Sequence, residues 1–187
     1  MGKLFATIDG QLRTFIEAQR LFFVTTAPSG NGGHVNLSPK GHDSLRVLDD
    51  HTLAYLDFVG SGVETIAHLR DNGRIVLMVC AFEGSPRIVR VHGRGEAVEP
   101  SDTRFVELRA RFSPEDRGTV RSIIVIHAQR ISDSCGFGVP LYEYRGEREQ
   151  LREWCEKKGP EKIHTYQMEK NARSVDGLPG LSWVTKD

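Results

Sequence analysis

The sequence predicts a mainly β fold, an antiparallel barrel or sandwich of six to seven strands. The first observation is a series of short runs rich in β-branched and aromatic residues, separated by turns that contain glycine, proline or aspartate. The second is that few segments show helical periodicity, so repeated strand–helix–strand units are not expected. At 187 residues the chain can form one domain with a sizeable core. A closed or nearly closed barrel would also remove exposed strand edges.

The first half of the chain is expected to contain one helix and four strands. Apolar residues at helical spacing predict an opening helix over Asp9 to Gln19. The loop from Pro28 to Gly33 tolerates positive φ, so the strands on either side of it should form a hairpin. The expected strands are Leu21 to Ala27, His34 to Ser38, Ser44 to Leu48 and Thr52 to Phe58.

Three longer strands are expected in the second half. Glycine and proline in the segment from Glu83 to Pro86 predict a hairpin between the first two of them. The expected elements are a helix from about Val63 to Asn72, strands Arg74 to Phe82 and Arg87 to Val98, a helix near Ser101 to Phe112, and a last strand from Thr119 to Ile131.

The composition changes at Cys135. Charged, helix-prone segments follow around Glu147 to Lys158 and Glu161 to Arg173, and Pro160 suits a first helical position. These segments are too polar to form a core of their own. Residues 1–134 are therefore expected to form the barrel domain, and residues 135–187 a loop and helical extension packed on the barrel or on a second subunit.

Charge and composition exclude several classes of partner. Basic and acidic residues balance at 25 each, so no field that would attract nucleic acid is expected. No apolar run reaches the ~20 residues that span a bilayer, and no secretion signal precedes the fold, so we expect no membrane association and a cytoplasmic location. The three cysteines and seven histidines lack metal-ligand spacing, so no metal is expected.

The junction after Phe58 reads Val59-Gly60-Ser61-Gly62-Val63-Glu64-Thr65, where a predicted strand turns into a predicted helix. The first N–H groups of a helix lack internal partners and carry partial positive charge, so a phosphate fits there. The hydroxyls of Ser61 and Thr65 can donate to phosphate oxygens. Ser61 and Glu64 equally fit a capping box, which would satisfy the helix end without a ligand.

The stretch from Val35 to Gly41 places Pro39 and Lys40 at the end of a strand. Proline cannot donate within a sheet, so the strand must end or lie at an edge there, which leaves backbone groups free for a ligand. Lys40 can supply positive charge to a phosphate. It also fits an ordinary solvated lysine beside a strand-ending proline.

The order of these stretches is distinctive. Along the chain come an opening helix, Val35 to Gly41, Leu53 to Phe58, Gly60-Ser61 opening a helix, Asp71 to Leu77 and Arg90 to Glu96. This succession, over roughly Phe5 to Ile131, resembles the FMN-binding split barrels related to pyridoxamine 5'-phosphate oxidase. The resemblance implies a six- to seven-stranded antiparallel Greek-key split β-barrel with a helical C-terminal extension. It also implies a homodimer with FMN at the interface.

The resemblance further implies which residues hold the FMN. Along the isoalloxazine ring would lie Val35, Asn36, Leu37 and Ser38. The ribityl chain and phosphate would be held by Asp57, Phe58, Ser61, Gly62 and Thr65. Family members often carry two basic residues just after the Gly-Ser pair, which this chain lacks. Lys40 and Arg121 are therefore the candidates that neutralise the phosphate, and Glu64 is assigned to capping.

The implied activity is that of a flavin-dependent oxidoreductase acting on an unknown small molecule. The tail lacks the Arg-x-His arrangement that binds substrate in pyridoxamine phosphate oxidases, so that reaction is not implied, and no catalytic residue can be named. A non-catalytic protein that binds flavin, deazaflavin or haem is the first alternative. The second is a Rossmann-like NAD site, in which Gly60-x-Gly62 would meet the pyrophosphate and Glu83 the ribose.

Overall fold

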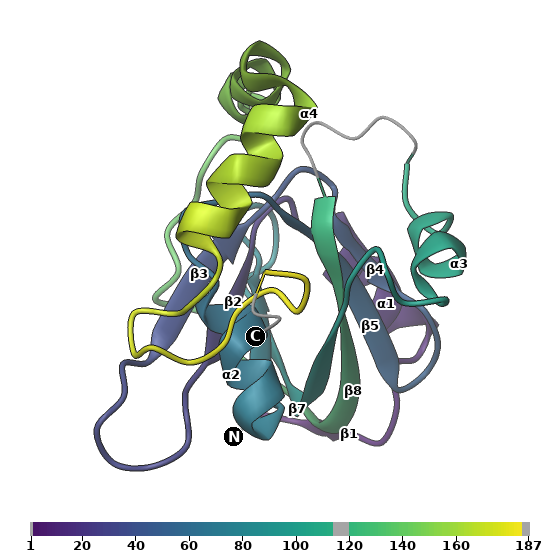
Figure 1. Ribbon diagram of the computed structural model, residues 1–187. Coiled ribbons are helices and arrows are strands. Elements are labelled where there is room, and N and C mark those ends of the chain that lie inside the picture. The colour runs from purple at the N-terminus through teal and green to yellow at the C-terminus, as the bar shows by residue number, and fades with distance from the viewer. Residues whose placement is uncertain (1, 114–119, 185–187) are drawn as a thin grey trace.

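The computed structural model describes residues 2–113 and 120–184 and contains one antiparallel sheet (Figure 1). Its eight strands are β1 (Leu4–Phe5), β2 (Phe22–Thr26), β3 (Asn36–Lys40), β4 (Leu45–Val47), β5 (Thr52–Phe58), β6 (Arg74–Cys80), β7 (Ile88–Val98) and β8 (Val120–Ser134). The helices are α1 (Gly10–Ala18), α2 (Glu64–Asn72), α3 (Phe105–Arg109) and α4 (Gln150–Lys170). The mainly β prediction is confirmed.

The strands follow the order β3-β2-β6-β7-β8-β5-β4, and β1 pairs with β8. The three consecutive strands β6, β7 and β8 are followed in space by β5, which is the Greek-key arrangement. No pairing joins β3 to β4 within the described residues, so the barrel is split at that seam. The Greek-key split barrel predicted from the sequence is confirmed, with the two-residue β1 as the strand that the prediction missed.

This topology rules out the Rossmann-like alternative. β5 pairs antiparallel with β4 and β8, whereas α2 leads into β6, which is separated from β5 by β7 and β8. A dinucleotide fold would require the two strands that flank the helix to be parallel members of one βαβ unit. Glu83 instead lies in the β6–β7 turn, where its Oε1 accepts the N–H of Tyr144 over 3.1 Å.

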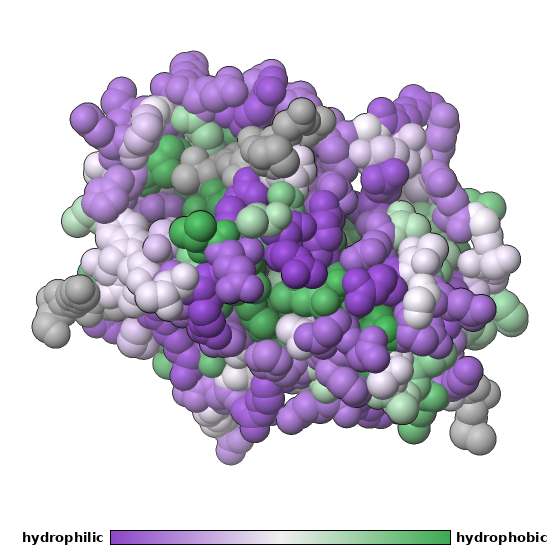
Figure 2. Space-filling view, turned by 90° about the vertical axis from the view of Figure 1, so that its right-hand side faces the viewer, coloured by the Kyte–Doolittle hydropathy of each residue, from purple (hydrophilic) through white to green (hydrophobic). Residues whose placement is uncertain are grey.

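The centre of the sheet is buried on both faces. Along β5, Leu53 and Tyr55 point into the main core, while Ala54 and Leu56 belong to a second apolar cluster beneath α3. The alternation follows from the two-residue repeat of a strand. The face of the molecule on the α3 side is mostly hydrophilic, with apolar residues visible in a hollow near its centre (Figure 2).

The C-terminal extension packs on the barrel of its own chain, on the β3 side (Figure 1). α4 consists of two helical halves separated at Gly159, whose φ of 73° is not helical, and Pro160 opens the second half as expected. Cys155 and Ile163 of α4 form a small cluster with Val59. The tail then returns to the main core, where Leu181 is fully buried.

Several element boundaries differ from the predictions. β3 continues through Pro39, which the sheet tolerates because β3 is an edge strand. β8 runs on to Ser134 because β7 and β1 pair with its second half, and the expected start at Thr119 lies outside the described residues. Within residues 2–113 and 120–184, no helix is long and apolar enough to cross a membrane.

Candidate functional site

A cavity of about 320 Å³ lies between the edge strand β3, the loop that joins β5 to α2, and the beginning of β8. Its floor and walls combine polar groups with a few apolar side chains. The lining residues are Asn36, Ser38, Pro39, Lys40, Phe58, Val59, Gly60, Gly62, Glu64, Thr65, Arg121 and Leu151. The last of these comes from α4, so the C-terminal extension forms part of the wall.

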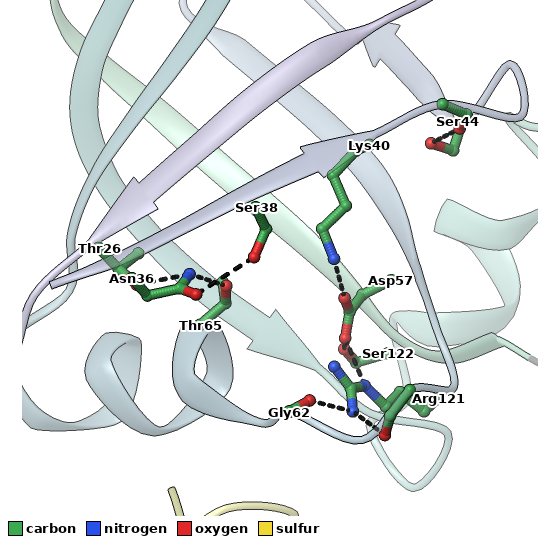
Figure 3. Close-up of polar contacts among 12 residues, drawn as sticks. Thr26, Asn36, Ser38, Lys40, Ser44, Asp57, Gly62, Thr65, Arg121 and Ser122 are labelled. Atoms are coloured by element: carbon green, nitrogen blue, oxygen red, sulfur yellow. Dashed lines mark hydrogen bonds and ion pairs between the residues drawn. The ribbon is translucent and has the colours of Figure 1, made fainter. Parts of the chain in front are cut away.

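An ionic centre occupies one side of the cavity (Figure 3). Asp57 of β5 is fully buried, and its two carboxylate oxygens accept hydrogen bonds from Lys40 Nζ at 3.0 Å and from Arg121 Nε at 2.7 Å. Ser122 Oγ adds a third contact at 3.3 Å. Burial alone would raise the pKa of the Asp57 carboxyl, but the charges of Arg121 and Lys40 hold that pKa well below its usual value. Two cations thus share one anion.

Arg121 also shapes the loop before α2. Its Nη1 donates to the carbonyl oxygen of Gly62 at 2.7 Å and to that of Gly60 at 3.3 Å. The Arg121 side chain is 5% exposed, so these contacts form away from bulk water. Hydrogen bonds in the protein interior are electrostatically stronger than those in water. Through Arg121, strand β8 therefore holds the conformation of the loop of residues 60–62, called the glycine loop below.

The capping box expected from the sequence does not form. α2 begins at Glu64 with Val63 as its N-cap residue, and no side chain of the described residues caps it. Glu64 Oε1 instead accepts the N–H of Val175 from the C-terminal tail at 3.2 Å. The assignment of Glu64 to capping was therefore wrong, because the N–H of Val175 in the tail competes for its carboxylate. The first turn of α2 keeps its unpartnered N–H groups near the cavity.

A neutral hydrogen-bond network lies on the opposite side of the cavity (Figure 3). Asn36 Nδ2 donates to Thr65 Oγ1 at 3.1 Å and to Thr26 Oγ1 at 3.5 Å, while Ser38 Oγ donates to Asn36 Oδ1 at 3.2 Å. Thr26 Oγ1 is also 3.0 Å from Nδ1 of the fully buried His68. Burial lowers the pKa of His68, which favours the neutral ring and an uncharged network.

The structure brings together most of the residues predicted for the site. Those that line the cavity are Asn36, Ser38, Lys40, Phe58, Gly62, Thr65 and Arg121, and Asp57 lies beneath it. Three others do not line it: Val35 and Leu37 are exposed on the outside of the edge, and Ser61 is exposed in the loop.

Sequence reasoning missed four residues that support the site. Thr26 could have been found from the predicted hairpin, because it pairs with Asn36 across β2 and β3. Nothing in the local sequence marks His68, Leu151 or Asn171. Asn171 donates from its Nδ2 to the Gly60 carbonyl at 2.9 Å although the two residues are 111 positions apart.

The open Greek-key barrel, with its cavity at the start of α2, defines a split-barrel protein. Comparison with known proteins is more specific: the model of the pyridoxamine 5'-phosphate oxidase family matches residues 8–135, more than half of the chain. The chain belongs to this family, which confirms the resemblance noted in the sequence.

One relative and one solved structure illustrate these similarities. An Aspergillus flavus protein described as pyridoxamine 5'-phosphate oxidase family protein ustO is 36% identical over 204 residues, covering 100% of this chain and 81% of the relative. The crystal structure of HupZ from Group A Streptococcus superposes with a TM-score of 0.50 at 24% identity, covering 66% of this chain and 91% of HupZ. At that identity the likeness to HupZ concerns the fold alone.

Proposed function

We propose that the protein binds FMN, with the phosphate in the cavity between Lys40, Arg121 and the first turn of α2. The observation that carries this proposal is the ionic centre, in which two cations share the single carboxylate of Asp57 and so leave one positive charge in excess at that centre, beside the helix N-terminus. The carboxylate of Glu64 also lines the cavity, where it accepts the N–H of Val175. A doubly charged phosphate complements both features. Membership of the family and the sequence resemblance to FMN-binding split barrels support the choice of cofactor.

The donor set fits a flavin nucleotide. Lys40 Nζ can offer further N–H groups beyond its contact with Asp57, and Thr65 offers a hydroxyl. Ser38 and Asn36 can meet the polar groups of the ring and ribityl chain along β3. Among the described residues that line the cavity there is no His, Cys, Met or Tyr, the side chains that usually ligate haem iron, which favours a flavin over haem.

The proposed assembly is a homodimer with the flavin at the interface. Its support is the edge strand β3, where Leu37 is 63% exposed and Val35, just before the strand, is 69% exposed, both beside the cavity. Exposed apolar side chains beside the outer edge of a sheet are features that a second subunit can cover. In this proposal residues 1–134 form the flavin-binding domain, residues 135–187 its extension, and the protein acts in the cytoplasm.

The proposed activity is that of a flavin-dependent oxidoreductase acting on a small molecule. A bound flavin supplies hydride transfer, and the protein supplies binding, orientation and exclusion of water. Among the residues of this chain, the neutral network around Asn36 orients the ligand and the ionic centre holds its anionic end. A non-catalytic flavin or deazaflavin carrier uses the same contacts, and turnover with a reduced nicotinamide or an organic donor separates the two.

The test is the visible absorption spectrum of the protein purified without added cofactor, followed by mass analysis of the small molecule released on denaturation. We expect flavin bands near ~450 nm and the mass of FMN. A deazaflavin mass would redirect the proposal to that cofactor. A colourless protein that also fails to bind added FMN in equilibrium dialysis would refute it.

A further inference from the structure

The carbonyl oxygen of Gly60, in the loop that joins β5 to α2, is held by donors from two distant parts of the chain. Asn171 Nδ2 donates to it over 2.9 Å, and Arg121 Nη1 over 3.3 Å. The Arg121 nitrogen makes its shorter contact, 2.7 Å, to the Gly62 oxygen. Asn171 is therefore the principal donor to the Gly60 carbonyl among the described residues.

Asn171 is itself fixed by its surroundings. It is fully buried at the end of α4, where its N–H donates to the Gln167 carbonyl at 2.8 Å and its own carbonyl accepts the N–H of Leu181 at 3.0 Å. The returning tail can approach this closely because residue 180 is glycine, since a Cβ there would lie 2.1 Å from the Asn171 carbonyl oxygen. The backbone of Asn171 is thus held by hydrogen bonds on both sides.

The other half of the Asn171 amide is not used. Its Oδ1 is buried and has no hydrogen-bond partner within the described residues. A buried acceptor without a partner costs stability, and a leucine of the same shape would avoid that cost. The amide at position 171 is therefore better explained by what its Nδ2 does to the glycine loop than by a contribution to folding.

The hydrogen bonds to the Gly60 carbonyl also fix the orientation of the N–H group on the same peptide, which belongs to Ser61. A trans peptide is planar, so the N–H of Ser61 points opposite to the Gly60 carbonyl. Glycines on both sides of Ser61 would otherwise leave this peptide many orientations. A loop ordered before the ligand arrives does not have to be ordered during binding, which improves affinity.

We propose that Asn171 is a positioning residue for the phosphate half of the cofactor. From the C-terminal extension it preorganises the loop of residues 60–62, which contributes Gly60 and Gly62 to the cavity wall, while Asn171 itself does not line the cavity. The inference rests on the proposed function and adds to it a residue 111 positions away from the loop. It assigns the extension an indirect part in cofactor recognition, exerted through the loop.

The test compares the affinities of Asn171→Leu and wild type for FMN and for riboflavin, which lacks the phosphate, by quenching of flavin fluorescence. Fixing one residue's backbone is worth roughly a five- to thirtyfold change in affinity, so FMN should bind that much more weakly. Riboflavin affinity and the melting temperature of the cofactor-free protein should stay unchanged. Gln167→Leu, one turn earlier on the same buried face of α4, should leave all three quantities at wild-type values.

The other possible outcomes would contradict the proposed role of Asn171. Equal losses for FMN and riboflavin together with a lower melting temperature would assign Asn171 a purely structural role, and unchanged FMN affinity would exclude any role. Asn171→Ala provides the same comparison if the leucine variant does not fold. Failure of the wild-type protein to bind FMN would overturn the proposed function and this inference together, whereas wild-type binding with no effect of Asn171→Leu overturns only the latter.

Discussion

The two sides of the cavity are built on different physical principles. On one side Lys40, Asp57 and Arg121 form an ionic centre whose carboxylate is fully buried. On the other side Thr26 and Asn36 belong to a network of neutral hydrogen bonds that ends at a buried His68. Charge dominates the first side and hydrogen-bond geometry the second.

This difference divides the expected roles of the two sides. A buried charge without its partner is costly, so the ionic centre should govern both folding and the affinity for an anion. A neutral hydrogen bond contributes only about 0.5–1.5 kcal/mol net, so the network should orient a ligand with a small effect on stability. The following variants test whether the ionic centre has the larger effect on stability and on the affinity for an anion.

Removal of the shared carboxylate should have the largest effect. Asp57→Asn leaves Lys40 and Arg121 facing each other without an anion, and the loss of one partner of a buried pair typically costs about 3–5 kcal/mol. Urea denaturation should show a loss of this size. Asp43→Asn, which breaks an exposed pair with Arg46, is the matched control and should cost no more than about 1 kcal/mol. Equal losses of unfolding free energy in the two variants would show that the buried ionic centre contributes no more to stability than an exposed ion pair.

The same centre predicts a pH dependence. Because the pKa of Asp57 is lowered in the folded state, its ionised form stabilises the fold at pH values above the ordinary carboxyl pKa of 3.8. That stabilisation is lost as the pH falls below 3.8 towards the lowered pKa. The difference in unfolding free energy between wild type and Asp57→Asn should therefore narrow over this acidic range. A difference that stays constant down to pH 2 would contradict the assigned ion pairs.

Lys40→Met should weaken FMN binding by roughly ten- to a hundredfold, because a hydrogen bond to a charged group contributes about 1.5–3 kcal/mol. Riboflavin affinity should change much less, since that ligand has no phosphate. Lys162→Met on the exposed surface of α4 is the control and should bind both ligands as wild type does. Isothermal titration calorimetry measures all four affinities. Parallel losses for the two flavins would place the phosphate away from Lys40.

The neutral side should give the smallest change. Thr26→Val removes the hydroxyl that lies between His68 and Asn36 and should cost about 1 kcal/mol of unfolding free energy. Any loss of affinity should be the same for FMN and riboflavin, because the network does not contact the phosphate in this account. Thr26→Ser keeps the hydroxyl and should retain the wild-type affinities. A loss of affinity for FMN but not for riboflavin in Thr26→Val would show that the neutral side also contributes to phosphate binding.

The sequence predicted the parts of the fold that depend on local patterns. The hairpin of β2 and β3 followed from the turn residues between them, and the start of the second half of α4 followed from Pro160. The family resemblance supplied the Greek-key order. It also brought Arg121 into consideration beside Lys40, which the strand-ending stretch had already indicated, and the structure joins the two through Asp57.

The remaining features depend on contacts between distant segments. The start of α2 is set by Arg121 on the Gly62 carbonyl and by the Val175 N–H on Glu64, and neither partner is visible near the capping-box pattern. Leu151 reaches the cavity only because α4 packs against Val59. A local motif reports the preference of its own residues, and here tertiary hydrogen bonds outweigh that preference.

The position of the phosphate is tested most directly by a crystal structure of the protein with FMN bound. We expect phosphate oxygens about 3 Å from Lys40 Nζ and from the Arg121 guanidinium, at the first turn of α2. A phosphate bound elsewhere, with the Lys40–Asp57–Arg121 centre facing only solvent or protein, would contradict it.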